Sequence, residues 1–122
     1  RKALKAFFES DIFARIKKAK TVKREMRFLT ELPAKRIAPS LDDSFNSESI
    51  MVQGAVDLCF EEDDGIAVLD FKTDRTENPD DLKIAYGEQL AIYAAACEKI
   101  FLKPVKQKII YSFALSAAVE LE

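Results

Sequence analysis

The sequence predicts an α/β (α+β) fold in the order helix, three strands, helix, two strands. Two observations predict it. Apolar residues recur every three or four positions near the N-terminus and across residues 79–101, and they alternate or run continuously in the segments between and after these. At 122 residues with 48% hydrophobic content, the chain is long enough for one domain with a buried core.

The first 49 residues are expected to form a helical stretch, a strand and a loop. The helical stripe comprises Leu4, Phe7, Phe8, Ile12, Phe13 and Ile16. The pair Ser10-Asp11 within it leaves open whether there is one helix or two. In the strand Thr21 to Leu32, Glu25 falls on the charged face, either as a site residue or as a surface residue. Residues 33–49 contain two prolines and little periodicity, so we expect a mobile loop.

The second and third strands carry two acids. Along residues 50–60 one apolar stripe is expected, formed by Ile50, Val52, Val56, Leu58 and Phe60. Asp57 is then expected on the opposite side, in a row with Met51, Gln53 and Cys59. Residues 61–65 are polar and end in glycine, which predicts a hairpin turn into the antiparallel strand 66–72. Pairing in register about that turn places Asp57 and Asp70 opposite one another.

A pair of facing carboxylates predicts a cation between them. Two such groups a few ångströms apart repel, and a hard divalent ion with oxygen ligands is the usual solution. Residues 66–71 form an almost continuous apolar run typical of a buried strand, where an unpaired Asp70 is costly. Lys72 shares the face of Asp70 because the two are two positions apart. A plain salt bridge between them is the alternative, and Asp57 taken alone is more typical of a structural residue.

The last helix begins with clear start signals. Asn78 is the expected N-cap, Pro79 occupies the first turn, and two acids follow. We expect this helix to pause near Gly87 and then to continue to about Phe101. A strand from Val105 and a short strand at residues 119–121 complete the order.

One face of this helix carries Tyr86, Gln89 and Tyr93, which are three and four positions apart. Amphipathic packing is the alternative role for the two tyrosines, and a hydrogen bond to a loop is the alternative for Gln89.

Three segments, in this order and at these distances, resemble the nuclease domain of the PD-(D/E)XK superfamily. They are Gly54-Ala-Val-Asp57, Asp70-Phe-Lys-Thr-Asp-Arg75 and Tyr86-Gly-Glu-Gln-Leu-Ala-Ile-Tyr93, with Arg24-Glu-Met-Arg-Phe28 as a weaker upstream match. The resemblance lies in the branch shared by RecB-like and AddA-like helicase-nucleases and covers nearly the whole chain, which is similar to the C-terminal nuclease domain of the AddA subunit. It implies a restriction-endonuclease-like core with a mixed central sheet flanked by helices.

The resemblance implies roles for the residues on the two central strands. Asp57 and Asp70 match the metal-binding acids, and the backbone carbonyl of Phe71 is a further metal ligand. Lys72 matches the lysine that positions or activates the attacking water. Magnesium is the expected ion because the ligands are all oxygen, and manganese is a plausible substitute.

Further residues are expected around this centre. By the resemblance, Gln89 and Tyr93 support the site and contact nucleic acid, and Glu25 lines the same cleft. Tyr86 is expected to contact DNA. Arg75, just past the catalytic strand, is placed to meet a phosphate, although a solvated arginine is an equal alternative.

The function implied is that of a metal-dependent DNA exonuclease domain, which hydrolyses phosphodiester bonds with metal-activated water. It belongs, by the resemblance, to a helicase-nuclease of double-strand-break repair and recombination. The implied partners are DNA, a helicase part of the same parent chain and an AddB-like subunit. Two alternatives remain: a catalytically inactive nucleic-acid-binding module of the same fold, and a structural interaction domain whose acids are salt-bridged by chance.

Charge is unevenly distributed along the chain. Residues 1–36 carry twelve Lys or Arg against four Asp or Glu, and residues 37–122 carry seven against seventeen. A basic region suits phosphate binding, and an acidic centre suits metal binding. A solvated basic helix is the alternative for the first region.

The residue content excludes other kinds of site. There is no histidine, which excludes a His-based metal centre or a His general base within this segment. RecB-like nucleases usually carry an upstream histidine, so we expect residues 1–122 to be an N-terminally truncated nuclease domain that binds metal weakly. Cys59 and Cys97 lie in apolar patterns and are expected to be buried thiols. No membrane span or signal peptide is visible, and the expected location is the bacterial cytoplasm.

Overall fold

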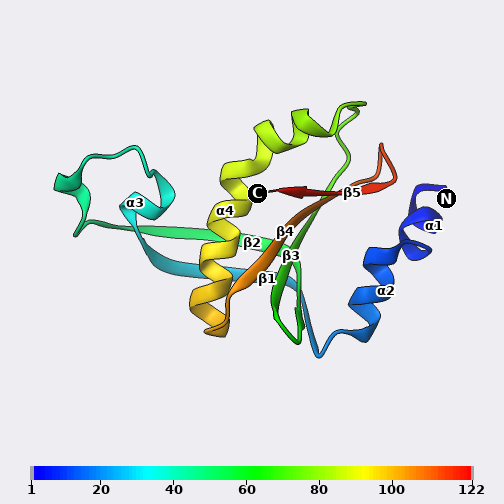
Figure 1. Cartoon of the computed structure of the whole chain (residues 1–122), viewed down its shortest axis with the longest axis horizontal. Coiled ribbons are helices and arrows are strands. Elements are labelled where there is room, and N and C mark those ends of the chain that lie inside the picture. The colour runs from blue at the N-terminus through cyan, green and yellow to red at the C-terminus, as the bar shows by residue number, and fades with distance from the viewer. Residues whose placement is uncertain (1, 122) are drawn as a thin grey trace.

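A five-stranded sheet in the order β1-β2-β3-β4-β5 forms the centre of the molecule (Figure 1). The computed structural model describes residues 2–121. The strands are β1 (Thr21–Pro33), β2 (Ser49–Glu62), β3 (Gly65–Lys72), β4 (Val105–Ser112) and β5 (Ala117–Leu121). The helices are α1 (Lys2–Phe8), α2 (Asp11–Lys18), α3 (Ala34–Ile37), the 3-10 turn η1 (Asp43–Phe45) and α4 (Pro79–Phe101). The predicted fold class and element order are confirmed, with α3 and η1 added.

The sheet is mixed. β3 and β4 run parallel, and the other neighbouring pairs run antiparallel. Parallel neighbours need a long crossover, and α4 supplies it. Within the described part of the chain, no helix is long and apolar enough to cross a membrane.

The crossover helix α4 is continuous for 23 residues. At its start, the side chain of Asn78 accepts a hydrogen bond from the Asp80 N–H at 3.0 Å, as the start signals predict. The predicted pause at Gly87 is wrong. A Cβ added at Gly87 would meet no atom within 4 Å, so the glycine costs only about 1 kcal/mol of helix propensity, which packing of the helix on the sheet outweighs.

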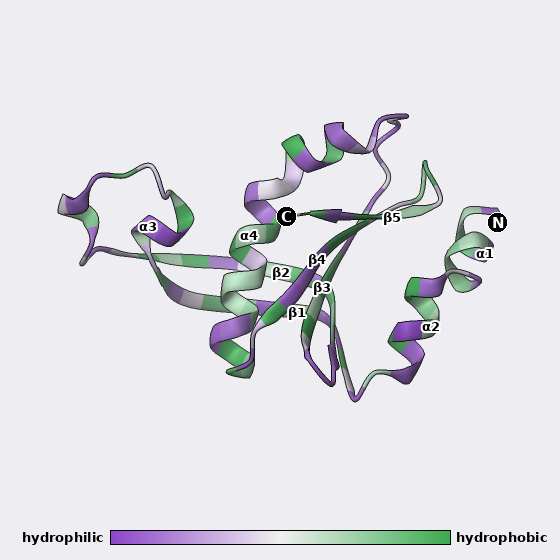
Figure 2. Cartoon of the chain, viewed as in Figure 1, coloured by the Kyte–Doolittle hydropathy of each residue, from purple (hydrophilic) through white to green (hydrophobic). Residues whose placement is uncertain are grey.

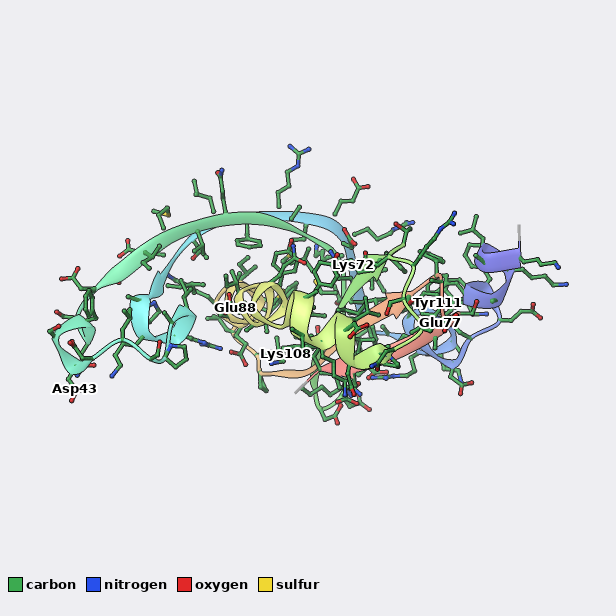
Figure 3. All side chains as sticks on the ribbon, turned by 90° about the horizontal axis from the view of Figure 1, so that it is seen from above. Asp43, Lys72, Glu77, Glu88, Lys108 and Tyr111 are labelled. Carbon is green, nitrogen blue, oxygen red and sulfur yellow. The ribbon has the colours of Figure 1, made fainter. Side chains whose placement is uncertain are left out.

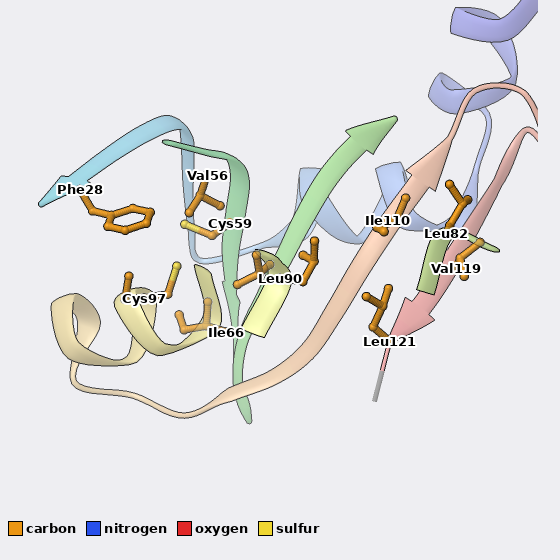
Figure 4. Packing of buried hydrophobic residues seen from close by; sticks show 12 residues of the cluster. Phe28, Val56, Cys59, Ile66, Leu82, Leu90, Cys97, Ile110, Val119 and Leu121 are labelled. Carbon is orange, nitrogen blue, oxygen red and sulfur yellow. The ribbon is translucent and has the colours of Figure 1, made fainter. Parts of the chain in front are cut away.

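Helices cover the two faces of the sheet, and each face has its own cluster of buried residues. The α4-side cluster comprises Phe28, Val56, Cys59, Ile66, Val68, Leu82, Leu90, Ala96, Cys97, Ile110, Val119 and Leu121 (Figure 4). The rear cluster, under α1 and α2, comprises Phe7, Ile12, Ile16, Leu58, Phe60, Ala67, Leu69, Ile109 and Tyr111. The second half of β4 belongs to both clusters and is hydrophobic, whereas its first half is hydrophilic (Figure 2).

The single apolar stripe predicted along β2 is wrong. Val56 lies in the α4-side cluster, whereas Leu58 and Phe60 lie in the rear cluster. Cys59 is on the same side as Val56, although three positions separate them. The strand therefore changes face between Val56 and Leu58, at Asp57.

Strand β1 has a backbone irregularity at the matching point. Glu25 has a φ of 48°, in the left-handed region that non-glycine residues rarely adopt. The pairing of β1 with β2 keeps its register across it, since Arg24 pairs with Leu58 and Met26 with Val56. Both strands thus turn over together, and no periodicity in the sequence indicates this.

The N-terminal region forms two helices, which resolves the alternative left open by the sequence. The Ser10 side chain accepts a hydrogen bond from the Phe13 N–H at 3.3 Å and caps α2. Helix α2 is tied to the sheet because Arg15 binds both carboxylate oxygens of Glu62, at 2.6 and 3.1 Å. Lys106 of β4 binds the same carboxylate at 2.7 Å.

The segment between β1 and β2 closes a long hairpin ribbon (Figure 1). It contains α3 and η1, which an ion pair of 3.0 Å between Lys35 and Asp43 connects. Arg36 also pairs with Glu98 of α4. The mobility expected for residues 33–49 stays a prediction.

Replacing Glu62 by Gln is expected to destabilise the domain at pH 7 by about 1–2 kcal/mol. The hydrogen bond from Arg15, followed by that from Lys106, lowers the pKa of Glu62 from 4.5 to about 2. A lowered pKa contributes stability that is present above pH 4.5 and is lost as the pH falls toward 2. The full shift corresponds to about 3 kcal/mol, and partial exposure reduces it. Urea unfolding of both proteins from pH 7 to pH 3 checks this: the gap should narrow in acid, and a constant gap contradicts the account.

Candidate active site

The strand register brings three acids into one row across the sheet. Leu58 of β2 pairs with Leu69 of β3, so one step further Asp57 lies opposite Asp70. On the other side, the pairs Arg24–Leu58 and Met26–Val56 place Glu25 opposite Asp57. The row lies where β1 and β2 change face.

The two aspartates are held differently. Asp57 Oδ2 accepts a hydrogen bond of 2.9 Å from the Phe71 N–H. Asp70 is only 3% exposed, and among residues 2–121 no hydrogen bond of good geometry reaches its Oδ2, although the Lys72 ammonium lies 2.8 Å away. Burial, and then the adjacent Asp57 carboxyl, raise the pKa of Asp70 to about 6 against the opposing effect of Lys72.

Lys72 lies at the end of β3, close to α4 (Figure 3). Its Nζ is 2.8 Å from Asp70 Oδ2, donates to Gln89 Oε1 at 3.2 Å and sits 4.0 Å from the ring centroid of Tyr86. Burial alone would lower the pKa of Lys72, but the interaction with Asp70 outweighs it and the pKa is raised. The lysine is therefore cationic at neutral pH. The salt bridge considered from the sequence is present, but one ammonium faces two carboxyl groups.

Helix α4 turns the predicted face toward this centre. Tyr86 and Gln89 contact Lys72 directly. Tyr93 packs edge-on against Phe28 of β1, with ring centroids 5.8 Å apart. A Cβ on Gly54 would lie 3.0 Å from the Phe28 ring and 3.3 Å from the Tyr93 ring, so the glycine of the Gly54–Asp57 segment permits this close packing.

Two predicted residues stand apart from these contacts. Glu25 is opposite Asp57 in register, but its side chain is exposed. Arg75 is exposed in the segment after β3 and forms no hydrogen bond or ion pair with the described residues. Their predicted roles, and those of the other site residues, stay predictions.

Sequence reasoning missed one residue beside the centre. Asp74 accepts a hydrogen bond of 2.8 Å from the Tyr86 hydroxyl. Asp74 lies within the segment that carries the resemblance, but only the fold shows that it meets a residue twelve positions later. No spacing in the sequence signals such a contact.

The residues present fit a divalent metal ion with few protein ligands. Among residues 2–121, no three His, Cys, Asp or Glu side chains are gathered to hold a metal. The side-chain ligands on offer are therefore Asp57 and Asp70. Their two carboxyl groups face one ammonium, and Asp70 Oδ2 lacks a hydrogen bond. A cation that binds through one or two carboxylates and retains several waters matches this set.

Relatives with known names match nearly the whole chain. One is the AddA subunit of the ATP-dependent helicase/nuclease of Thermoanaerobacter sp. (strain X514), 37% identical over 112 residues, which covers 90% of this chain and 9% of the relative. The proteins of the same name from Bacillus cytotoxicus and Bacillus mycoides are 39% and 38% identical over 126 residues, covering 96% of this chain and 10% of each relative. The chain thus spans about a tenth of the length of these relatives.

The family comparison agrees with the geometry. The model of the PD-(D/E)XK nuclease superfamily matches residues 1–119. Nucleases of this superfamily generally use divalent metal ions. The match includes every strand of the sheet that carries the row of acids and Lys72. The chain therefore belongs to the PD-(D/E)XK nuclease superfamily.

Proposed function

We propose that this chain is a DNA nuclease domain that hydrolyses phosphodiester bonds with Mg²⁺, for which Mn²⁺ can substitute. The observation that carries the proposal is the facing pair of carboxyl groups with one ammonium beside it. Asp57 and Asp70 hold the ion, together with the backbone carbonyl of Phe71. When bound, the ion polarises the scissile phosphate and lowers the pKa of water.

Lys72 orients the attacking water. Its ammonium is fixed between a carboxylate of the metal site and the Gln89 amide oxygen, which leaves a donor for a water or a phosphate oxygen. Its raised pKa keeps it a hydrogen-bond donor and a positive charge at neutral pH, which stabilises the charge that develops on the phosphate. Lys72 therefore acts by positioning and electrostatics, and it does not serve as the base.

The DNA lies across the site from α4 to the segment after β3. Tyr86, Gln89 and Tyr93 on α4 contact it, and Arg75 binds a phosphate, since its guanidinium is exposed and unpaired within residues 2–121. Glu25 lines the same cleft beside Asp57. The lysines and arginines of residues 1–36 add attraction for the nucleic acid backbone.

The parent protein supplies the DNA. Because the relatives are named as a part of an ATP-dependent helicase/nuclease, we place this domain after a helicase part of the same chain, acting as an exonuclease on the strands it delivers. An AddB-like subunit is the proposed partner. Double-strand-break repair and recombination in the bacterial cytoplasm is the proposed setting.

Replacing Lys72 by Ala is expected to reduce metal-dependent DNA cleavage by about 10²–10⁴-fold, because the group that orients the water is lost. The assay follows end-labelled linear DNA with Mg²⁺ or Mn²⁺, in this chain and in a form extended toward the N-terminus. Lys83→Ala, which changes an exposed lysine of α4, is the matched control and should cleave normally. Cleavage by Lys72→Ala at the control rate contradicts the proposal.

Replacing Asp70 by Asn is expected to stabilise the metal-free protein by about 1–3 kcal/mol at pH 7.5. The raised pKa means that the folded state binds more protons than the unfolded state between pH 4 and 6, so the Asp70 contribution to stability falls as the pH rises through that window. The gain should vanish at pH 4. Excess Mg²⁺ should favour wild type, which alone keeps both ligands.

Denaturant unfolding with EDTA or Mg²⁺ measures this difference. Glu88→Gln, an exposed acid on α4, controls for the loss of one negative charge. A destabilised Asp70→Asn protein at pH 7.5 in EDTA would show that the carboxylate pair is not under electrostatic strain.

A further inference from the structure

A chain of contacts leads from Lys72 to a residue without an assigned role. The Lys72 ammonium lies 4.0 Å from the centroid of the Tyr86 ring, and the Tyr86 hydroxyl donates to Asp74 Oδ2 at 2.8 Å. Asp74 is two positions after Lys72, in the exposed segment that follows β3, whereas Tyr86 is in α4. The contacts therefore close a loop from the end of β3 to the helix and back to the lysine.

The Tyr86 ring needs fixing if it is to hold the lysine. A lysine side chain has a flexible four-carbon stem and about 2 kcal/mol of rotamer entropy, so one ion pair leaves its ammonium free to swing. The ring face attracts the ammonium and limits that motion. Tyr86 is only half-buried, and its hydroxyl hydrogen bond to Asp74 is what anchors the outer end of the ring.

Asp74 also strengthens the ring as a partner for a cation. A phenol that donates to a carboxylate gains electron density on its ring, which increases the attraction to an ammonium above the face. The hydrogen bond between Tyr86 and Asp74 thus acts on Lys72 both by geometry and by charge.

We infer that Asp74 is a positioning residue, which sets the place of the Lys72 ammonium through Tyr86. Its effect on turnover rests on the proposed nuclease function, but its effect on Lys72 does not. Asp74 acts through Tyr86 and not as a metal ligand, since its carboxylate is committed to the hydroxyl.

The first test uses NMR of the metal-free chain and needs no cleavage. The ring current of Tyr86 should shift the Cε protons of Lys72 upfield. Asp74→Asn and Tyr86→Phe should each move this signal toward the value of a solvated lysine, and Tyr86→Leu should abolish the shift. Glu77→Gln, which removes an exposed charge from the same segment, should leave it unchanged. A Lys72 signal that ignores Asp74→Asn overturns the inference.

The second test measures kinetics in the form that cleaves DNA. Asp74→Asn should lower kcat by about five- to tenfold, with KM and the metal dependence unchanged. Tyr86→Phe should lower kcat equally, and the double variant should lose no more, because both remove one hydrogen bond. Asp74→Glu should restore part of the rate.

Other kinetic outcomes overturn the inference. Independent, multiplicative losses in the double variant show that Asp74 does not act through Tyr86. Recovery of Asp74→Asn at high metal concentration shows that Asp74 is a metal ligand. If the NMR result is as expected and no form cleaves DNA, the positioning stands and the proposed function fails.

Discussion

The facing carboxyl groups of Asp57 and Asp70 are the constraint on which the rest of the site depends. The short turn between β2 and β3 sets their register, with Glu62 paired to Gly65 at its base. A slip of one residue in that pairing would move Asp57 to the other face of the sheet. The anchoring of Glu62 by Arg15 and Lys106, at the same end of the hairpin, therefore stabilises the strands that hold the acids.

The second requirement is a cation at the correct side of this pair, and α4 meets it. As the crossover between parallel strands, α4 must return across the sheet from the end of β3, so its polar face passes next to Lys72. Gln89 and Tyr86 then contact the ammonium, while Tyr93 packs against Phe28 above Gly54. Topology thus explains why these residues of the helix are presented to the site.

The order of elements and the Asp57–Asp70 pairing followed from the sequence because hairpin length and strand period determine them locally. The change of face at Asp57 did not, because it depends on a left-handed backbone at Glu25 that a glutamate does not signal. Continuity of α4 through Gly87 depends on packing, which propensity does not include. The hydrogen bond from Tyr86 to Asp74 arises only from the way α4 returns over β3.

The most direct test of the central claim is a crystal structure of the chain soaked with Mn²⁺, using the anomalous signal of manganese. The account predicts one peak within bonding distance of carboxylate oxygens of both Asp57 and Asp70 and of the Phe71 carbonyl. A structure at high Mn²⁺ concentration with no peak there, and with Lys72 still paired to Asp70, would contradict it and favour the plain salt bridge.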